Sequence, residues 1–211
     1  MRVVLAGFGP FPGAPVNPSG ALAKALVRSR RPALAGLDRS AHVFATSYAA
    51  VDRGLPKLFA DKPDIVLLFG LAGRRRQICV ETRARNAVSV IFPDASRHRP
   101  SRSVIKLGGQ PELTGHAPFA QLVSAVRAHK VPVRMSRDAG RYLCNYIYWR
   151  ALERAAKGST LVQFVHIPSL CRNTQPKRRR GRHSLSLADL IRAGESLLIA
   201  LVAASRRRRE H

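Results

Sequence analysis

The chain has 211 residues, 45% of them hydrophobic, which favours a single domain with a sizeable core over two domains. Its longest apolar runs fall short of the roughly 20 residues that a transmembrane helix needs, and the opening segment lacks a signal-peptide core, so we expect a cytoplasmic protein without a membrane span. Because the formal charge is +25, we consider an anionic partner such as nucleic acid.

The predicted elements alternate between strands and helices along the chain. Continuous apolar runs, such as DIVLLFG at 64–70, are typical of strands covered on both faces. The alternation predicts an α/β fold: a three-layer α/β/α single domain over 1–205 with a mostly parallel, mixed central sheet, followed by a basic tail at 206–211. In chain order we expect a strand at 2–7, a helix at 18–30, a strand at 41–48, a helix at 50–60, strands at 64–70 and 77–86, a long loop or flap at 93–115, a helix at 118–130, a strand at 131–135, a helix at 139–158, a strand at 160–168 and a helix at 186–204.

The basic residues are mostly scattered. The runs KRRRGR (177–182) and RRRR (206–209) hold nine of the 37 lysines and arginines. The chain has no basic zipper, zinc finger or aromatic-basic RNA-binding signature, so an arginine-rich, solvated surface is the favoured interpretation. Nucleic acid is then expected only as a non-specific partner of that surface.

The three cysteines lack the C-x-x-C spacing of a zinc site, and their odd number argues against a disulfide framework. The chain also lacks a Walker loop, an H-E-x-x-H motif and a G-x-S-x-G elbow, and the glycines of GFGPFPG fail the dinucleotide fingerprint. We therefore expect no metal and no cofactor.

Cys144 lies in AGRYLCNYIYW (139–149), near the expected start of a helix. Unpaired N–H groups and the positive end of the helix dipole favour a thiolate there, which is a nucleophile at neutral pH. A free cysteine is also a common small buried hydrophobe, so a packing role stays open.

A thiol nucleophile needs a base, and His166 is the histidine placed where a core strand ends. It follows LVQFV and precedes Ile167 and Pro168, so the chain has to turn there. A buried, hydrogen-bonded structural histidine has the same pattern, and both interpretations stay open.

Glu81 stands alone among the acids inside an apolar alternating segment, ICVET. A carboxylate there is costly unless it is paired, so it is the candidate to orient the imidazole. Period-2 alternation places Cys79 on the same face as Glu81, where packing is its favoured role.

Four segments together resemble one known family. In order along the chain they are GFGPFPGAPVNPSG, GLAGRRRQICVETRARN, AGRYLCNYIYW and FVHIP. The pyroglutamyl peptidase type I (pyrrolidone carboxyl peptidase) family of cysteine peptidases has similar motifs in the same order. The resemblance implies removal of an N-terminal pyroglutamyl residue from peptides by a triad of Cys144, His166 and Glu81, in a divergent member of the family.

The resemblance also implies the surroundings of the triad. Phe8, Phe11, Leu71 and Leu143 would contact the substrate, and backbone groups at Cys144 and near Arg74 would hold the oxyanion. Self-association as a homodimer or homotetramer is implied as well. Two alternatives stay open: a cysteine hydrolase of another small amide, and a non-catalytic basic α/β domain that binds anionic partners.

Three positions depart from the family pattern. Gly9 stands where the opening motif has a glutamate, Pro12 replaces a glycine, and Thr82 replaces the arginine that follows the triad glutamate. The family's glutamate at position 9 and arginine at position 82 are thus both absent, which is consistent with loss of one ion pair between them. Arg83 or Arg85 would substitute for the missing arginine.

Overall fold

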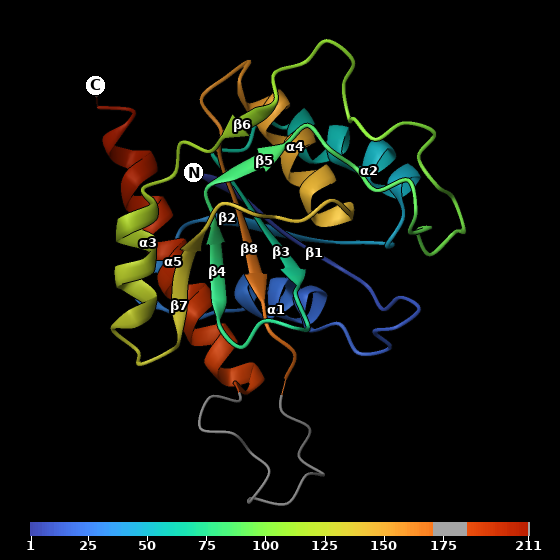
Figure 1. Cartoon of the computed structure of the whole chain (residues 1–211). Helices are drawn as coiled ribbons and strands as arrows, with labels where there is room; N and C mark the ends of the chain where they lie inside the picture. The colour runs from blue at the N-terminus through green and yellow to red at the C-terminus, as the bar shows by residue number, and fades with distance from the viewer. Residues whose placement is uncertain (171–184, 211) are drawn as a thin grey trace, which may run out of the picture.

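The computed structural model describes residues 1–170 and 185–210 (Figure 1). Its centre is a six-stranded sheet of order β2-β1-β3-β8-β4-β7. The four strands from β2 to β8 are parallel, and β4 runs antiparallel to β8 and parallel to β7. The predicted mostly parallel, mixed sheet is confirmed. Its strands are β1 (Arg2–Phe8), β2 (Asp38–Phe44), β3 (Ile65–Leu71), β4 (Ile78–Glu81), β7 (Val133–Ser136) and β8 (Leu161–Ile167).

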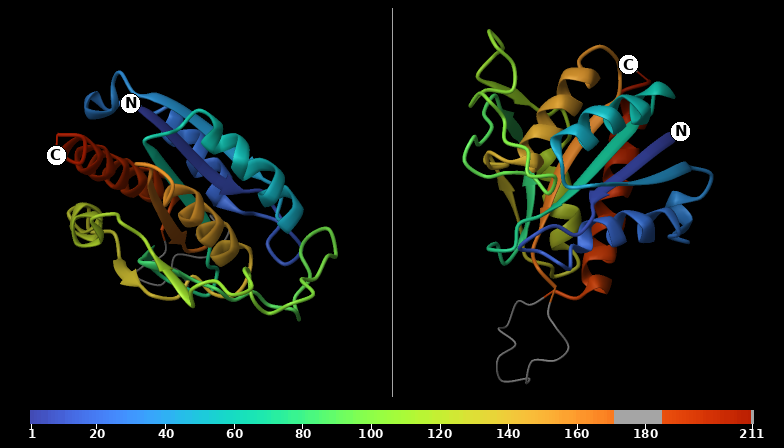
Figure 2. Two further views of the ribbon diagram at one scale, coloured as in Figure 1. Left: turned by 90° about the horizontal axis from the view of Figure 1, so that it is seen from above. Right: turned by 90° about the vertical axis from the view of Figure 1, so that its right-hand side faces the viewer.

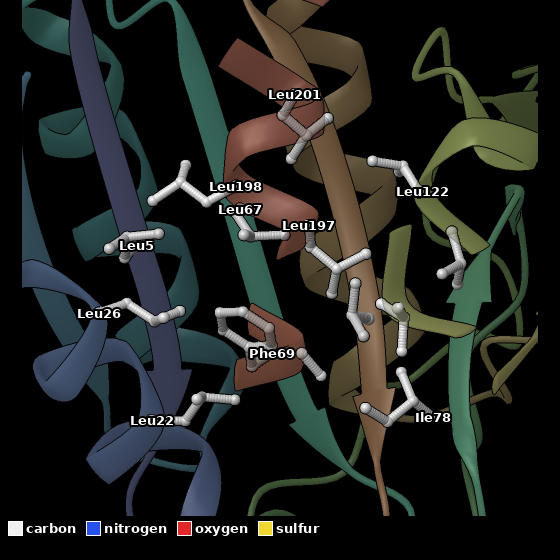
Figure 3. Packing of buried hydrophobic residues seen from close by; sticks show 14 of the residues in the cluster. Leu5, Leu22, Leu26, Leu67, Phe69, Ile78, Leu122, Leu197, Leu198 and Leu201 are labelled. Carbon is white, nitrogen blue, oxygen red and sulfur yellow. The ribbon is translucent and has the colours of Figure 1, made fainter. Parts of the chain in front are cut away.

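Successive residues of the central strands enter two different apolar clusters. In β3, Ile65, Leu67 and Phe69 pack into one cluster, and Val66 and Leu68 pack into the other. Figure 3 shows Leu67 and Phe69 directed toward the leucines of the covering helices. This is why the strands read as unbroken apolar runs: both faces of the sheet are buried.

Helices cover both faces and give the predicted three layers (Figure 2). On one face α1 (Pro18–Val27), α3 (Phe119–Arg127) and α5 (Leu187–Arg207) pack together over the first cluster. On the other face α2 (Tyr48–Ala60) packs against α4 (Leu143–Ala155).

Capping side chains explain where several helices begin. The Asn17 side chain accepts from the N–H of Ser19 at the start of α1, and Ser186 with Asp189 forms a capping box at the start of α5. At α2, the Ser47 hydroxyl accepts from the N–H of Ala50. The predicted strand at 41–48 is therefore wrong at its end, because β2 ends at Phe44 and Ser47 already caps the next helix.

The predicted strand at 77–86 is divided at Thr82. The N–H of Thr82 donates to the carbonyl of Ser136 beside β4, and its carbonyl accepts from Gly115. The chain thereby leaves the main sheet and continues as β5 (Arg83–Arg85), which pairs with β6 (Glu112–Thr114) in a small second sheet. β6 forms the end of the expected 93–115 loop, and a short 3₁₀ helix occupies Pro32–Leu34.

Of the two basic runs, the structure describes the one at 206–209 and not the one at 177–182. At the described run, α5 continues through Arg207, and Arg209 ion-pairs with Asp64, so the helix extends two residues into the expected tail. Within the described parts of the chain, no helix has the length and apolarity required to cross a membrane.

Candidate active site

Glu81 and His166 lie on neighbouring antiparallel strands. Cys79 of β4 stands opposite His166 of β8, and Glu81 stands opposite Phe164, so the two polar residues are diagonal neighbours on one face. The His166 Nδ1 atom lies 2.8 Å from Oε1 of Glu81. Both side chains are almost completely buried. The antiparallel pairing of β4 therefore brings the Glu81 carboxylate to a histidine 85 residues further along the chain.

Cys144 reaches the same place from the start of α4. Gly140, with a φ of +82°, turns the chain, and α4 begins at Leu143, so Cys144 is its second residue rather than lying a full turn inside it. Tyr142, the residue before the helix, provides no side-chain cap. The first N–H groups of α4 are therefore left for other acceptors, and their dipoles favour negative charge on the sulfur.

The sulfur of Cys144 lies against Gly70 at the end of β3, and it is close enough to His166 to raise the pKa of that imidazole. Because Nδ1 of His166 faces Glu81, its other nitrogen, Nε2, is left for a partner on the far side of the ring. The thiol, the imidazole and the carboxylate thus lie in one row, contributed by α4, β8 and β4.

Neighbouring charges shift the pKa values of His166 and Glu81. Burial alone would lower the pKa of His166, but the sulfur of Cys144 and the carboxylate of Glu81 outweigh it and raise that pKa to about 9. Burial would likewise raise the pKa of Glu81, and its contacts with His166 and Arg75 hold it below the usual range instead. The arrangement favours an imidazolium paired with the carboxylate of Glu81.

Arg75 is a partner of the row that the sequence did not single out. Its Nη1 lies 2.6 Å from Oε1 of Glu81, the same oxygen that faces His166. Its Nη2 donates to the carbonyl of Asp138 at 2.6 Å, which fixes the guanidinium from the other side. Arg75 follows β3 in an arginine run, and within such a run the sequence carries no signal for the one guanidinium that turns inward.

Asn145 holds the start of α4 in place. Its Oδ1 accepts from the N–H of Arg85 at 2.8 Å, and its Nδ2 donates to the carbonyls of Arg85 and Ala87, each at 2.8 Å. The side chain is completely buried. A polar residue next to the candidate nucleophile, inside an otherwise apolar helix turn, is the signal by which the sequence could have identified it.

An apolar cavity of about 450 Å³ lies between the residues just before α4 and the segment 88–92. Its wall includes Val88, Ile91, Phe92 and Tyr142, the last of these two residues before Cys144. The Tyr142 hydroxyl donates to the carbonyl of Pro93 at 2.8 Å, which ties the loop to the helix start. Burial, together with Asp94 and Cys144, raises the pKa of this phenol, so it stays neutral near the thiol.

Comparisons with known proteins agree on one family. A family model described as pyroglutamyl peptidase matches residues 1–207. The chain belongs to the pyroglutamyl peptidase family. The pyrrolidone-carboxylate peptidase of Streptococcus suis is 31% identical over 205 residues, covering 96% of this chain and 93% of the relative. That of Bacillus subtilis is 30% identical over 207 residues, covering 97% and 92%.

Solved structures of the family have the same fold. Pyroglutamyl peptidase I of Bacillus amyloliquefaciens superposes with a TM-score of 0.81 at 27% identity, covering 97% of each chain. The pyrrolidone carboxyl peptidase of Thermococcus litoralis gives a TM-score of 0.86 at 24% identity, covering 98% of this chain and 96% of that one.

The other residues expected at the site of this pyroglutamyl peptidase family member differ in exposure. Phe8 and Leu143 are buried in the second core cluster, whereas Phe11 and Leu71 are partly exposed. Arg74 is exposed in the turn after β3 that is closed by the bond from Arg75 N–H to the Ala72 carbonyl.

Of the three positions that depart from the family pattern, Gly9 and Pro12 lie in the loop after β1, and Thr82 lies between β4 and β5. Gly9 follows β1 and donates to the carbonyl of Phe44, and the Thr82 hydroxyl donates to the carbonyl of Ser136. Arg83 ion-pairs with Glu112, and Arg85 ion-pairs with Asp138. The two arginines expected to substitute for a lost base are thus engaged with acids near the β5–β6 sheet.

Proposed function

We propose that this chain is a cysteine peptidase that removes an N-terminal pyroglutamyl residue from peptides. The observation that carries the proposal is the connected row of Cys144, His166 and Glu81, whose spacing and charges suit nucleophilic catalysis. Family membership supplies the substrate class, since the curated relatives are named pyrrolidone-carboxylate peptidases.

In the first step, the Cys144 thiolate attacks the carbonyl carbon of the amide that links the pyroglutamyl residue to the next residue. The negative charge on the carbonyl oxygen is held by the N–H of Cys144 at the uncapped start of α4 and by backbone N–H groups of the turn at Arg74. The His166 imidazolium then donates its Nε2 proton to the leaving amine, and a thioester remains on Cys144.

In the second step, His166 accepts a proton from water as the water attacks the thioester. Pyroglutamate leaves and the thiolate is restored. Glu81 keeps the proton on Nδ1 and stabilises the imidazolium, and Arg75 holds Glu81 in its ionised form. Arg75 is thus a positioning residue for the carboxylate.

The pyroglutamyl ring is compact and carries no charge, so its pocket needs apolar contacts and no acidic anchor. The apolar cavity beside Tyr142 and the partly exposed Phe11 and Leu71 offer such contacts. Phe8 and Leu143 are buried in the second core cluster, which also contains Val88 of the cavity wall. None of the residues that line this cavity is an aspartate or glutamate that could bind a free ammonium group.

The test is turnover of a fluorogenic L-pyroglutamyl amide and of the corresponding L-prolyl amide, which carries a free amine in place of the lactam. We expect the wild-type chain to cleave the first and not the second. Cys144→Ser should lower kcat by on the order of 10⁴-fold or more. Cys79→Ser is the matched thiol control and should keep most of the activity, since Cys79 is buried and donates weakly to the Gln77 carbonyl.

Equal turnover of both amides, or equal loss in both cysteine variants, would refute the proposal. Cleavage of another small acyl amide in preference to the pyroglutamyl amide would favour the alternative hydrolase. Absence of Cys144-dependent turnover, with retained affinity for anions, would favour the binding domain.

A further inference from the structure

The main-chain carbonyl of Glu81 accepts two hydrogen bonds from buried side chains. The Tyr148 hydroxyl donates to it at 3.0 Å from α4, and Nε2 of Gln163 donates to it at 2.9 Å from β8. All three residues are completely buried. A carbonyl oxygen has two lone pairs, so these two donors use both of them. Because Glu81 is the last residue of β4, one buried oxygen joins the three elements that carry the candidate triad.

Tyr148 links α4 to this oxygen. It lies four residues after Cys144, so the two side chains project from the same face of the helix, one turn apart. The Tyr148 ring also packs against Phe164, with ring centroids 5.7 Å apart, and Phe164 contacts the His166 ring at 4.9 Å between centroids. The hydroxyl therefore restrains the helix face that carries the thiol, on the side where the imidazole lies.

Gln163 links β8 to the same oxygen, at a place where the strand register depends on few contacts. β4 and β8 share three residue pairs, which run from Cys79 opposite His166 to Glu81 opposite Phe164. β4 ends there, and the Gln163 amide forms the next link, since it also donates to the Phe164 carbonyl at 2.6 Å. A register shift of one residue would turn Glu81 to the other face of the sheet, away from His166.

The position of the Gln163 amide carries an energetic cost. Its Oε1 atom is buried and has no hydrogen-bond partner in the parts of the chain that the structure describes. Turning the amide over would place Oε1 against the carbonyl oxygens of Glu81 and Phe164, so the observed orientation is the favourable one. An apolar side chain of similar size would avoid the cost of the unpartnered oxygen. That cost is therefore tied to holding the Glu81 carbonyl.

Gly115 leaves room for the Tyr148 hydroxyl. A Cβ atom at position 115 would lie 2.5 Å from that oxygen, closer than real contacts allow. The N–H of Gly115 donates to the carbonyl of Thr82, the residue after Glu81. The hydroxyl is thus enclosed between Glu81 and the residue that follows β6, which restricts it to its bond with the carbonyl.

We propose that Tyr148 and Gln163 are positioning residues for the triad, which act through the main-chain carbonyl of Glu81. They hold the Glu81 carboxylate in register with His166, and they hold α4, with Cys144, against the same two strands. Their effect on turnover rests on the peptidase function proposed above. Their effect on His166 rests on the geometry of the three elements alone.

A simpler role for the same two bonds is to satisfy a carbonyl at the end of a short strand. That role predicts lower stability when a donor is lost, with an unchanged imidazole, because the Glu81 side chain would stay in place. The positioning role predicts that His166 loses part of its contact with the carboxylate, which lowers the pKa of the imidazole. Titration of His166 therefore separates the two roles.

The first test is Tyr148→Phe, which removes one hydroxyl and keeps the ring that packs on Phe164. We expect kcat for the pyroglutamyl amide to fall about ten-fold and KM to change by less than about two-fold, because the reacting groups shift while the substrate pocket is kept. NMR of the His166 ring, assigned with His166→Gln, should show a lower pKa than in the wild-type chain. Tyr146→Phe is the matched control on the same helix, since its hydroxyl donates to Asp52 at an exposed site, and it should leave kcat and the His166 titration unchanged.

The second test is Gln163→Met, which removes both donor bonds and the unpartnered oxygen at similar volume. It should lower kcat and the His166 pKa in the same direction as Tyr148→Phe. The double variant should lose less activity than the product of the two single losses, because either loss already frees the carbonyl. Gln121→Met is the control, since that exposed amide accepts from Arg207 far from Glu81 in the chain.

If Gln163→Met does not fold by circular dichroism, Gly115→Ala replaces it, because the added methyl group displaces the Tyr148 hydroxyl and leaves both donors in the chain. An unchanged His166 titration in the Tyr148 and Gln163 variants, equal losses of kcat in Tyr148→Phe and Tyr146→Phe, or strictly multiplicative losses in the double variant would overturn the proposal. Absence of turnover in the wild-type chain would refute the peptidase function instead, and the NMR titration would still decide the positioning role.

Discussion

Gly70 lies directly against the sulfur of Cys144. A Cβ atom at position 70 would be 2.8 Å from Sγ and 2.7 Å from Cζ of Phe164, closer than real contacts allow. The end of β3 therefore limits where the Cys144 sulfur can lie, although Gly70 offers no chemical group of its own.

The first prediction follows from this contact. Gly70→Ala should displace the thiol from His166 and lower kcat by about 10–100-fold, because a displacement of about 1 Å at a reacting atom has effects of this size. The thiol itself remains and should still be titrated by a thiol reagent. Gly158→Ala is the control, since a Cβ there meets nothing within 4 Å. Equal activities of the two variants would show that the thiol is not held against β3.

The second prediction concerns Arg75. Arg75→Met removes the guanidinium that shares Oε1 of Glu81 with His166, so the buried carboxylate loses one of its two charged partners. The free energy of unfolding should fall by about 3 kcal/mol, and the acid limb of the kcat/KM profile should move to higher pH as the Glu81 pKa rises. Arg76→Met, at an exposed neighbouring position, is the control. An unchanged acid limb in Arg75→Met would exclude the positioning role.

The third prediction is a pH dependence. The pKa of His166 is raised to about 9, so kcat/KM should fall above about pH 9 as the imidazolium that protonates the leaving amine is lost. Because the folded pKa exceeds the ordinary value of 6.5, the stability from this group is complete below about pH 6.5 and is lost as the pH rises through 9.

The contribution of Glu81 to stability depends on pH in the opposite direction. Its folded pKa is lowered, so its contribution is present above the ordinary value of 4.5 and is lost as the pH falls through the folded pKa. Glu81→Gln should move the high-pH limb to lower pH, since the imidazolium loses its carboxylate. Denaturant unfolding and pH-rate profiles of both proteins check these shifts, and a high-pH limb that stays in place in Glu81→Gln would contradict the assignment.

The fourth prediction concerns Asn145. Asn145→Ala removes three buried hydrogen bonds to the 85–87 segment and should lower the free energy of unfolding by about 3 kcal/mol, at about 1 kcal/mol for each bond. It should also lower kcat, because the start of α4 is no longer held. Asn86→Ala also removes three amide bonds, at a more exposed site, and should cost less. Greater loss in Asn86→Ala than in Asn145→Ala would contradict this account.

The sequence by itself determined the layers of this protein and its most apolar strands. Apolar runs such as 64–70 become β3 because both faces of the sheet are buried, and the cost of burying Glu81 without a partner already marked it as paired. The sequence also predicts that His166 lies at the end of a core strand, because it follows the apolar run LVQFV. These features depend on local composition and on the general cost of burying polar groups.

Only the tertiary structure decided which groups meet. The antiparallel placement of β4 beside β8 joins Glu81 to His166, the break at Thr82 sends β5 to β6, and one arginine among several turns inward to Glu81. The exact start of α4, which puts Cys144 at its second position, depends on Gly140 and Asn145. Contacts between residues far apart in the chain arise from strand order and from a shared buried volume, and no local pattern of side chains specifies either.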